Sequence, residues 1–230
     1  HLGGLTLWRF HGQTMEPILH WKAHEKTIHS LVWRGDTLIS GGADGFVGFW
    51  EGSALASCVD CRPGGVNGLA LTPDHQTLLI ASDDQTLRLW DIEAATLRGR
   101  WMGHRGWVTC VATHPSGEYA ITGSADANLV LWRLADGEAT VWNGHVDSVT
   151  QVRFVGSGEW VVSASRDGVI KLWEFASGKI VKTLRGHEAQ VNGLAHKDDR
   201  LFSCSADYRV GVWSMDGPKT RHLGWLQGHR

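Results

Sequence analysis

Residues 103–132 read GHRGWVTCVATHPSGEYAITGSADANLVLW, and this stretch decides the fold. Pro115 and Gly117 punctuate its first turn, and a tight turn around Asp126 follows. Four short β-rich runs surround these turns, at residues 107–112, 118–122, 129–132 and 139–142. No part of the unit has helical periodicity. Four short antiparallel strands in succession predict one blade of a β-propeller.

The same unit recurs along the chain, and each copy contains an aspartate six residues before a tryptophan. The five pairs are Asp44/Trp50, Asp84/Trp90, Asp126/Trp132, Asp167/Trp173 and Asp207/Trp213. Successive tryptophans lie 40, 42, 41 and 40 residues apart. A period near forty indicates an array of similar units, each too small to bury its own apolar face. We therefore expect residues 1–230 to form a single all-β domain of stacked blades.

Three motifs repeat in a fixed order within the unit: a Gly-His pair, a Ser-x-x-x-Asp turn and a Leu-Trp-Asp strand end. Residues Leu89-Trp90-Asp91 are the full form of the last motif. Over essentially the whole chain these motifs resemble the WD-repeat (Trp-Asp repeat) family. The resemblance implies a β-propeller in which the outermost strand of one blade precedes the three inner strands of the next. Other dipeptides replace Trp-Asp in four units, namely Trp50-Glu51, Trp132-Arg133, Trp173-Glu174 and Trp213-Ser214.

The sequence contains five complete units and parts of others. Residues 5–9 and 18–22 have the pattern of the last two strands of a preceding blade, and Gly228-His229-Arg230 has the pattern of a further repeat's opening. We expect a propeller domain truncated at both ends, with five complete blades and a partial one. The parent ring would have six or seven blades, and the resemblance favours seven. A fragment of this kind leaves exposed strand edges.

A histidine, a serine or threonine, an aspartate and a tryptophan recur together in four units. The sets are His24/Ser40/Asp44/Trp50, His104/Thr122/Asp126/Trp132, His145/Ser163/Asp167/Trp173 and His187/Ser203/Asp207/Trp213. Four copies of a Ser-His-Asp catalytic triad make little chemical sense, and no nucleophile-elbow motif accompanies them. The resemblance implies instead a structural tetrad linked by hydrogen bonds. Buried indole, hydroxyl and imidazole groups need such partners, so we expect each tetrad to join the inner strands of its blade.

The second unit departs from this pattern. Arg62 stands at the histidine position and Ile80 at the Ser/Thr position, while Asp84 and Trp90 remain. One interpretation is drift, with an ion pair between Arg62 and Asp84 as a substitute for the tetrad. The other is a specialised site, because Cys58-Val-Asp-Cys61 lies just upstream and a C-x-x-C pair can bind metal or cycle between redox states. No second pair at zinc-site spacing is present in the sequence.

Composition narrows the functional classes. The net charge is −2 and no run of five Lys or Arg occurs, which argues against a nucleic-acid partner. No apolar stretch approaches 18 residues, so no membrane span is predicted. Four cysteines in 230 residues do not indicate a disulfide framework, so we expect a reducing, cytoplasmic compartment. No pattern predicts a catalytic residue, a metal site or a cofactor, and the oligomeric state stays open.

The resemblance places partners on the propeller face around the central channel. This face would be lined by residues shortly after each Gly-His pair and by the residue before each turn aspartate. The first set comprises Lys26, His29, Gly65, Asn67, Trp107, Thr109, Ser148, Thr150, Gln190 and Asn192, and the second comprises Ala43, Asp83, Ala125, Arg166 and Ala206. Trp107 and Arg166 are the strongest candidates, because aromatic and Arg side chains dominate binding hot spots. The alternative is that Trp107 packs on a neighbouring blade and Arg166 is merely solvated.

These observations favour a non-enzymatic protein–protein interaction scaffold that presents loops to a protein or peptide, as one domain of a longer protein. An RNA-associated propeller in a ribonucleoprotein or processing complex is the alternative, and an enzyme with a site in the central channel is a third hypothesis. Among the remaining residues, Trp21, Trp142 and Trp225 are expected on outer strands, and Trp33 and Trp160 between blades. Cys110 and Cys204 are expected to be buried in strands.

Overall fold

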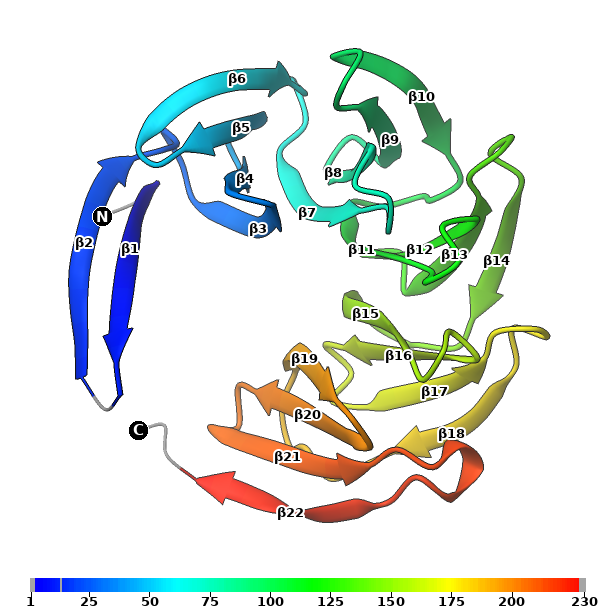
Figure 1. Ribbon diagram of the computed structural model, residues 1–230. Coiled ribbons are helices and arrows are strands. Elements are labelled where there is room, and N and C mark those ends of the chain that lie inside the picture. Colours follow the sequence, from blue (N-terminus) through cyan, green and yellow to red (C-terminus); the bar gives the residue numbers. More distant parts are fainter. Residues whose placement is uncertain (1–2, 13, 228–230) are drawn as a thin grey trace.

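The computed structural model describes residues 3–12 and 14–227, and the chain it describes is all-β. Five four-stranded antiparallel sheets and one two-stranded sheet follow one another around a ring, as Figure 1 shows. This confirms the predicted propeller architecture of five complete blades and a partial one. The segment Gly228-His229-Arg230, expected to open a further repeat, lies outside the described residues, as does His1.

The strand bounds are as follows: β1 (Gly4–His11), β2 (Thr14–Lys22), β3 (Ile28–Arg34), β4 (Thr37–Gly42), β5 (Phe46–Glu51), β6 (Ala54–Asp60), β7 (Val66–Leu71), β8 (Thr77–Ser82), β9 (Thr86–Asp91), β10 (Thr96–Met102), β11 (Val108–Thr113), β12 (Tyr119–Ser124), β13 (Asn128–Arg133), β14 (Ala139–Asn143), β15 (Val149–Val155), β16 (Trp160–Ser165), β17 (Ile170–Glu174), β18 (Ile180–Leu184), β19 (Val191–Lys197), β20 (Arg200–Ser205), β21 (Arg209–Ser214) and β22 (His222–Gln227). One short 3₁₀ helix, η1 (Gly217–Lys219), precedes β22. No helix in the described part of the chain is long and apolar enough to cross a membrane.

Each blade keeps its strands in chain order, from an inner strand beside the central channel to an outer strand at the rim. The inner strands are β3, β7, β11, β15 and β19. The hairpin β1–β2 and the blade β19–β22 lie on the two sides of an opening in the ring (Figure 1). In the described residues, β1 pairs with β2 alone, so its other edge is free.

The hydrophobic core lies between neighbouring blades. One cluster joins Ile121 and Leu129 of the blade β11–β14 to Val149, Val152 and Val161 of the blade β15–β18. Each of these five side chains is at most 2% exposed. Burial of this apolar surface needs two blades, which is why a single repeat could not fold alone.

Tryptophan pairs cross the same boundaries. Trp101 of β10 stacks on Trp132 of β13 with ring centroids 5.8 Å apart, and Trp142 of β14 stacks on Trp173 of β17 at the same separation. In each pair the outer strand of one blade contacts the tetrad tryptophan of the next. The sequence repeat is therefore out of phase with the sheet.

Two predictions about individual side chains are wrong. Trp33, expected between blades, lies near the end of β3 and is 54% exposed. Cys204, expected to be buried, is exposed. The equivalent residue in the first blade is Gly41. It packs tightly against the next blade, because a Cβ atom at this position would lie 2.5 Å from Cγ1 of Val66. No following blade covers β20 within the residues that the structure describes, so the thiol of Cys204 meets solvent.

Candidate interaction surface

A chain of hydrogen bonds joins four side chains in the blade β15–β18. Trp173 Nε1–H donates to Ser163 Oγ at 2.8 Å, and Ser163 Oγ lies 2.7 Å from His145 Nε2. His145 Nδ1 lies 2.9 Å from Asp167 Oδ2. Because a carboxylate can only accept, Nδ1 carries the proton and Nε2 accepts from the serine hydroxyl. Every polar group in the series therefore has a partner.

The other three predicted sets have the same arrangement around a serine or threonine hydroxyl. The hydroxyl oxygen accepts from the indole N–H at 2.8 Å in Ser40 (from Trp50), 2.8 Å in Thr122 (from Trp132) and 2.9 Å in Ser203 (from Trp213). Each of these oxygens also lies 2.7 Å from an imidazole Nε2, that of His24 for Ser40, of His104 for Thr122 and of His187 for Ser203. The distances from His Nδ1 to the carboxylate are 2.9, 3.2 and 2.8 Å for Asp44, Asp126 and Asp207.

The tetrad hydroxyls have no access to solvent. Ser40, Thr122, Ser163 and Ser203 are each 0% exposed. A buried hydroxyl that accepts from an indole and donates to an imidazole has its hydrogen-bonding capacity used inside the blade. These four side chains therefore hold strands together and offer no contact to a partner.

The tetrad aspartates also hold the loops above them. Asp167 accepts from the backbone N–H groups of Val146 and Val169 at 3.2 and 3.0 Å, and Asp126 accepts from Arg105 N–H at 2.7 Å. Burial raises the pKa of Asp167, but the hydrogen bonds from His145 and from these backbone groups outweigh burial and keep the pKa below its usual value. The ionised carboxylate is thus the form that the fold selects.

Burial acts on the histidines in the opposite sense. It lowers the pKa of both His104 and His145, although the neighbouring carboxylates raise it. The imidazole is accordingly neutral in the folded protein at neutral pH, as its role of donor at one nitrogen and acceptor at the other requires.

The second blade replaces the tetrad by a buried ion pair. Arg88 of β9 donates from Nη2 to Asp84 Oδ2 at 2.6 Å and to the carbonyl of Cys61 at 2.7 Å. Arg100 of β10 donates to the same Asp84 oxygen at 2.8 Å. Burial raises the pKa of Asp84, but hydrogen bonds from Thr86 and Arg88 outweigh it and bring the pKa to about 2.

The predicted pairing of Arg62 with Asp84 is wrong. Arg62 is exposed, donates to Asp60 at 2.6 Å and lies over the Phe46 ring at 4.7 Å from its centroid. Arg88 stands opposite Ile80 in the ladder and reaches Asp84 from inside the sheet, so it forms the pair that the loop residue does not. The signal in the sequence was an arginine between Leu87 and Leu89 on an otherwise apolar strand.

The cysteines beside this blade are free thiols: Cys58 is exposed on β6, and Cys61 is buried behind it. Burial raises the pKa of Cys61. Within residues 3–12 and 14–227, no group of three or more His, Cys, Asp or Glu side chains could hold a metal ion.

Backbone hydrogen bonds bring the two predicted sets of face residues together. In each blade the residue before the turn aspartate donates its N–H to the carbonyl of the residue before the inner strand. These bonds are Ala43 to Thr27 (2.8 Å), Asp83 to Gly65 (3.0 Å), Ala125 to Trp107 (2.9 Å), Arg166 to Ser148 (2.9 Å) and Ala206 to Gln190 (3.0 Å). Both loops therefore lie on the same end of every blade, and we call the surface they form the loop face. In the first blade the equivalent position is Thr27, so Lys26 lies one residue outside the set, although it too is exposed.

The loop face carries several large exposed side chains. Trp107 is 61% exposed rather than packed on a neighbouring blade, and Arg166 and Gln190 are also exposed. Sequence reasoning missed Val146, which is 87% exposed, and Tyr208, which is 68% exposed. Tyr208 has φ +65° at the turn position that glycine occupies in two blades and that Gln85 and Ala127 occupy, also at positive φ, in the other two. The turn therefore imposes this left-handed conformation in all five blades.

Other predicted face residues serve contacts within the ring. Thr109 Oγ1 donates to the carbonyl of Val149 at 2.5 Å, and Thr150 Oγ1 donates to that of Val191 at 2.5 Å. Asn67 Nδ2 donates to Asp83 at 2.6 Å and to the carbonyl of Val108 at 2.9 Å. These bonds link β7 to β11, β11 to β15 and β15 to β19. Their donors are therefore occupied.

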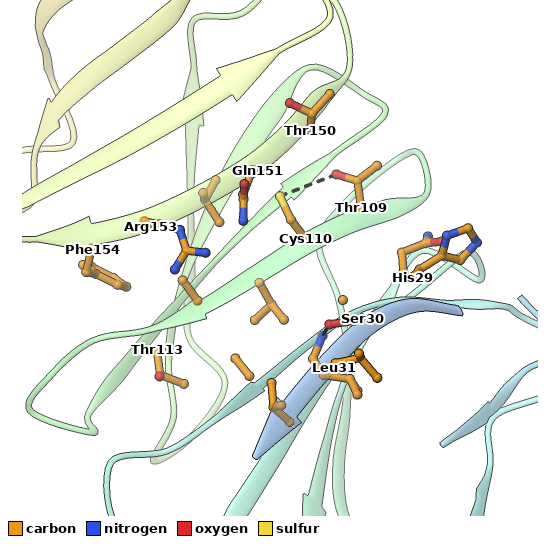
Figure 2. Close-up of a pocket in the computed structure, with 18 of the residues that line it drawn as sticks. His29, Ser30, Leu31, Thr109, Cys110, Thr113, Thr150, Gln151, Arg153 and Phe154 are labelled. Atoms are coloured by element: carbon orange, nitrogen blue, oxygen red, sulfur yellow. Dashed lines mark hydrogen bonds between the residues drawn. The ribbon is translucent and has the colours of Figure 1, made fainter. Parts of the chain in front are cut away.

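His29 and Asn192 occupy the same strand position as Thr109 and are exposed. His29, Thr109 and Asn192 line the central channel, which is a cavity of about 650 Å³ between the inner strands. Figure 2 shows part of this channel.

Comparison with known proteins gives an independent view of the repeats. The model of the family described as WD domain, G-beta repeat, matches residues 15–51, 54–91, 95–133, 138–174 and 178–214. Each matched segment begins in or just before the outer strand of one sheet and ends with the third strand of the next, in agreement with the stagger described above.

Curated relatives match parts of the chain at modest identity. Cilia- and flagella-associated protein 52 of Sus scrofa is 27% identical over 99 residues, which are 42% of this chain and 16% of that protein. Striatin-4 of Mus musculus is 28% identical over 169 residues, 67% of this chain and 18% of that protein. Ribosome biogenesis protein WDR12 homolog of Nematostella vectensis is 28% identical over 131 residues, 52% of this chain and 30% of that protein. The chain thus covers less than a third of the length of each.

Proposed function

The chain belongs to the WD domain, G-beta repeat family, and we propose that it is a non-enzymatic scaffold whose loop face binds a protein or peptide partner. Members of this family generally serve as interaction scaffolds. The partner contacts the loop face around Trp107 and Arg166. The tetrads hold that face rigid.

The exposure of Trp107 carries the proposal. A tryptophan that is 61% exposed offers a large apolar contact area, and such residues supply much of the energy of protein interfaces. The loop that carries it is fixed at two points, by the bond from Arg105 N–H to Asp126 and by the bond from Ala125 N–H to the Trp107 carbonyl. A preorganised anchor loses little conformational entropy on binding.

Affinity purification with substituted proteins tests the assignment. Trp107→Ala and Arg166→Ala should each remove partner proteins that the unsubstituted protein retains. Trp33→Ala is the matched control, because Trp33 is 54% exposed but lies near the far end of its inner strand, away from the loop face. Melting temperatures of all variants establish that they fold. Recovery of the same partners by the Trp107→Ala protein as by the unsubstituted protein would refute the proposal.

A second candidate is association with RNA in a ribonucleoprotein complex. One relative bears the name ribosome biogenesis protein WDR12 homolog, which supports this alternative, whereas the net charge of −2 weighs against it. Filter binding with a mixed-sequence RNA separates the two. Retention at moderate salt, with affinity that falls steeply as salt rises, would favour the RNA-associated function.

A further inference from the structure

The inner strand β15 differs from the other four in what it presents to the central channel. Counted from the first residue of each inner strand, the fifth position holds Arg153 in β15. The same position holds Val32 in β3, Ala70 in β7, Ala112 in β11 and Ala195 in β19. Among the five described inner strands, β15 alone therefore has a long cationic side chain where the others have an apolar one. Figure 2 shows Arg153 projecting from β15 beside Gln151.

Only part of the Arg153 side chain is used within the ring. Its Nε–H donates to the carbonyl of Leu194 at 2.6 Å, and Gln151 accepts from the N–H of the same residue. A guanidinium has five N–H donors, so this bond leaves the four donors of the two terminal nitrogens. None of the ion pairs within the described ranges includes Arg153, and no side-chain acceptor in those ranges takes these four donors.

No negative side chain of the described residues lines the channel around this cation. Its lining contains no aspartate or glutamate among the described residues, and Arg153 is the one side chain there with a permanent charge. The neighbouring groups are hydroxyls and amides, including Thr113 and Gln151. The side chain is accessible to solvent in the channel, yet partial burial lowers the pKa of its guanidinium. An unpaired cation in partly desolvated surroundings attracts an anion.

We propose that the central channel binds an oxyanion, a phosphate or carboxylate group, on the terminal nitrogens of Arg153. The planar fork of a guanidinium matches two oxygens of such a group and forms short, charge-assisted bonds. Arg153 lies four residues along β15 from the end at the loop face, or about 13 Å at the usual rise per residue. The anion site is thus separate from the loop face and does not depend on the proposed function.

The anion can come from two sources, a free phosphate ion or the terminal carboxylate of a peptide that enters the channel. Isothermal titration of the protein with inorganic phosphate tests the first. Titration with a short glycine-rich peptide, with either a free or an amidated C-terminus, tests the second. We expect millimolar binding of phosphate, of the free-acid peptide or of both, and none of the amidated peptide.

Arg153→Ala is the informative variant, since three other inner strands carry alanine at this position. It should weaken anion binding at least about tenfold. Arg153→Lys, which keeps the charge but loses the fork, should bind at an intermediate level and covers the case in which the alanine variant does not fold. Arg221→Ala, a surface change of equal charge, should bind as the unsubstituted protein does. Binding of neither anion, or equal binding by the Arg153→Ala and unsubstituted proteins, or equal losses in the Arg221→Ala protein, would overturn the proposal.

Discussion

Replacement of Asp84 by asparagine should destabilise the protein more than any single change at a tetrad aspartate. Asp84 accepts from Arg88 at 2.6 Å and from Arg100 at 2.8 Å. The side chain of Arg88 is 9% exposed, and its Nε–H already has no partner. Asparagine at position 84 would leave this buried guanidinium without a counter-charge.

Two estimates bracket the size of the effect. The pKa of Asp84 falls from its usual 3.8 to about 2, which corresponds to roughly 2 kcal/mol of stabilisation at about 1.36 kcal/mol per pKa unit. Removal of one partner from a buried ion pair typically costs about 3–5 kcal/mol. We therefore expect a loss of about 2–5 kcal/mol, or roughly 4–20 °C in melting temperature for a chain of this length.

Denaturant titration at pH 7, followed by tryptophan fluorescence, measures the loss. Asp36→Asn, on an exposed turn, is the control for the change of charge. The double variant Asp84→Asn/Arg88→Met should recover most of the stability, because it leaves no buried charge without a counter-charge. If Asp84→Asn lies within about 0.5 kcal/mol of the control, the range of ordinary surface substitutions, the ion pair does not hold this blade together.

Three further predictions concern the tetrads and the thiols. Asp167→Asn should lower the free energy of unfolding by about 1–3 kcal/mol. An amide NH₂ would then face the Nδ1–H of His145 and leave this buried donor unsatisfied. A melting temperature equal to that of the Asp36→Asn control would contradict this. Stability should fall as the pH drops below about 6.5. Burial holds the pKa of His104 and His145 below that value in the folded protein, so the unfolded chain takes up protons first and is favoured. Denaturant titrations at about pH 8 and about pH 5.5 with equal midpoints would refute this. Cys58 and Cys204 should react with an aromatic disulfide reagent in the native protein, and the two buried thiols only after unfolding; four thiols reacting at once would be inconsistent with the fold.

The architecture could be predicted because its signals are local and repeated. The aspartate six residues before each tryptophan marks a tight turn and the strand that follows it, and five copies leave little choice of fold. The same spacing located the tetrad positions, including the two that the second blade has lost at Arg62 and Ile80. The family resemblance supplied the stagger of the repeats against the blades.

The details that escaped prediction depend on side-chain contacts within and between blades. The sequence alignment predicted that Arg62 pairs with Asp84. The partner is instead Arg88, which lies four residues after Asp84 on the adjoining strand β9. Thr109 had the position of a partner-binding residue, but its hydroxyl bonds to the next inner strand. Cys204 belongs to a position that is buried only when another blade follows. The Thr109 contact joins residues 40 apart, and the Arg88 contact depends on the direction in which its side chain leaves β9. No local sequence pattern records either.

The offset between repeat and sheet has a consequence for how such an array grows. The segment 95–133 carries β10 of one blade together with β11, β12 and β13 of the next. It therefore contains both members of the Trp101–Trp132 pair that crosses the boundary. A tandem duplication of this segment would insert a new blade and, in the same event, the contact that seats it on its neighbour. The repeated unit thus contains the interface between two blades rather than one complete sheet. Added copies therefore need few compensating changes in the blade surfaces that pack together.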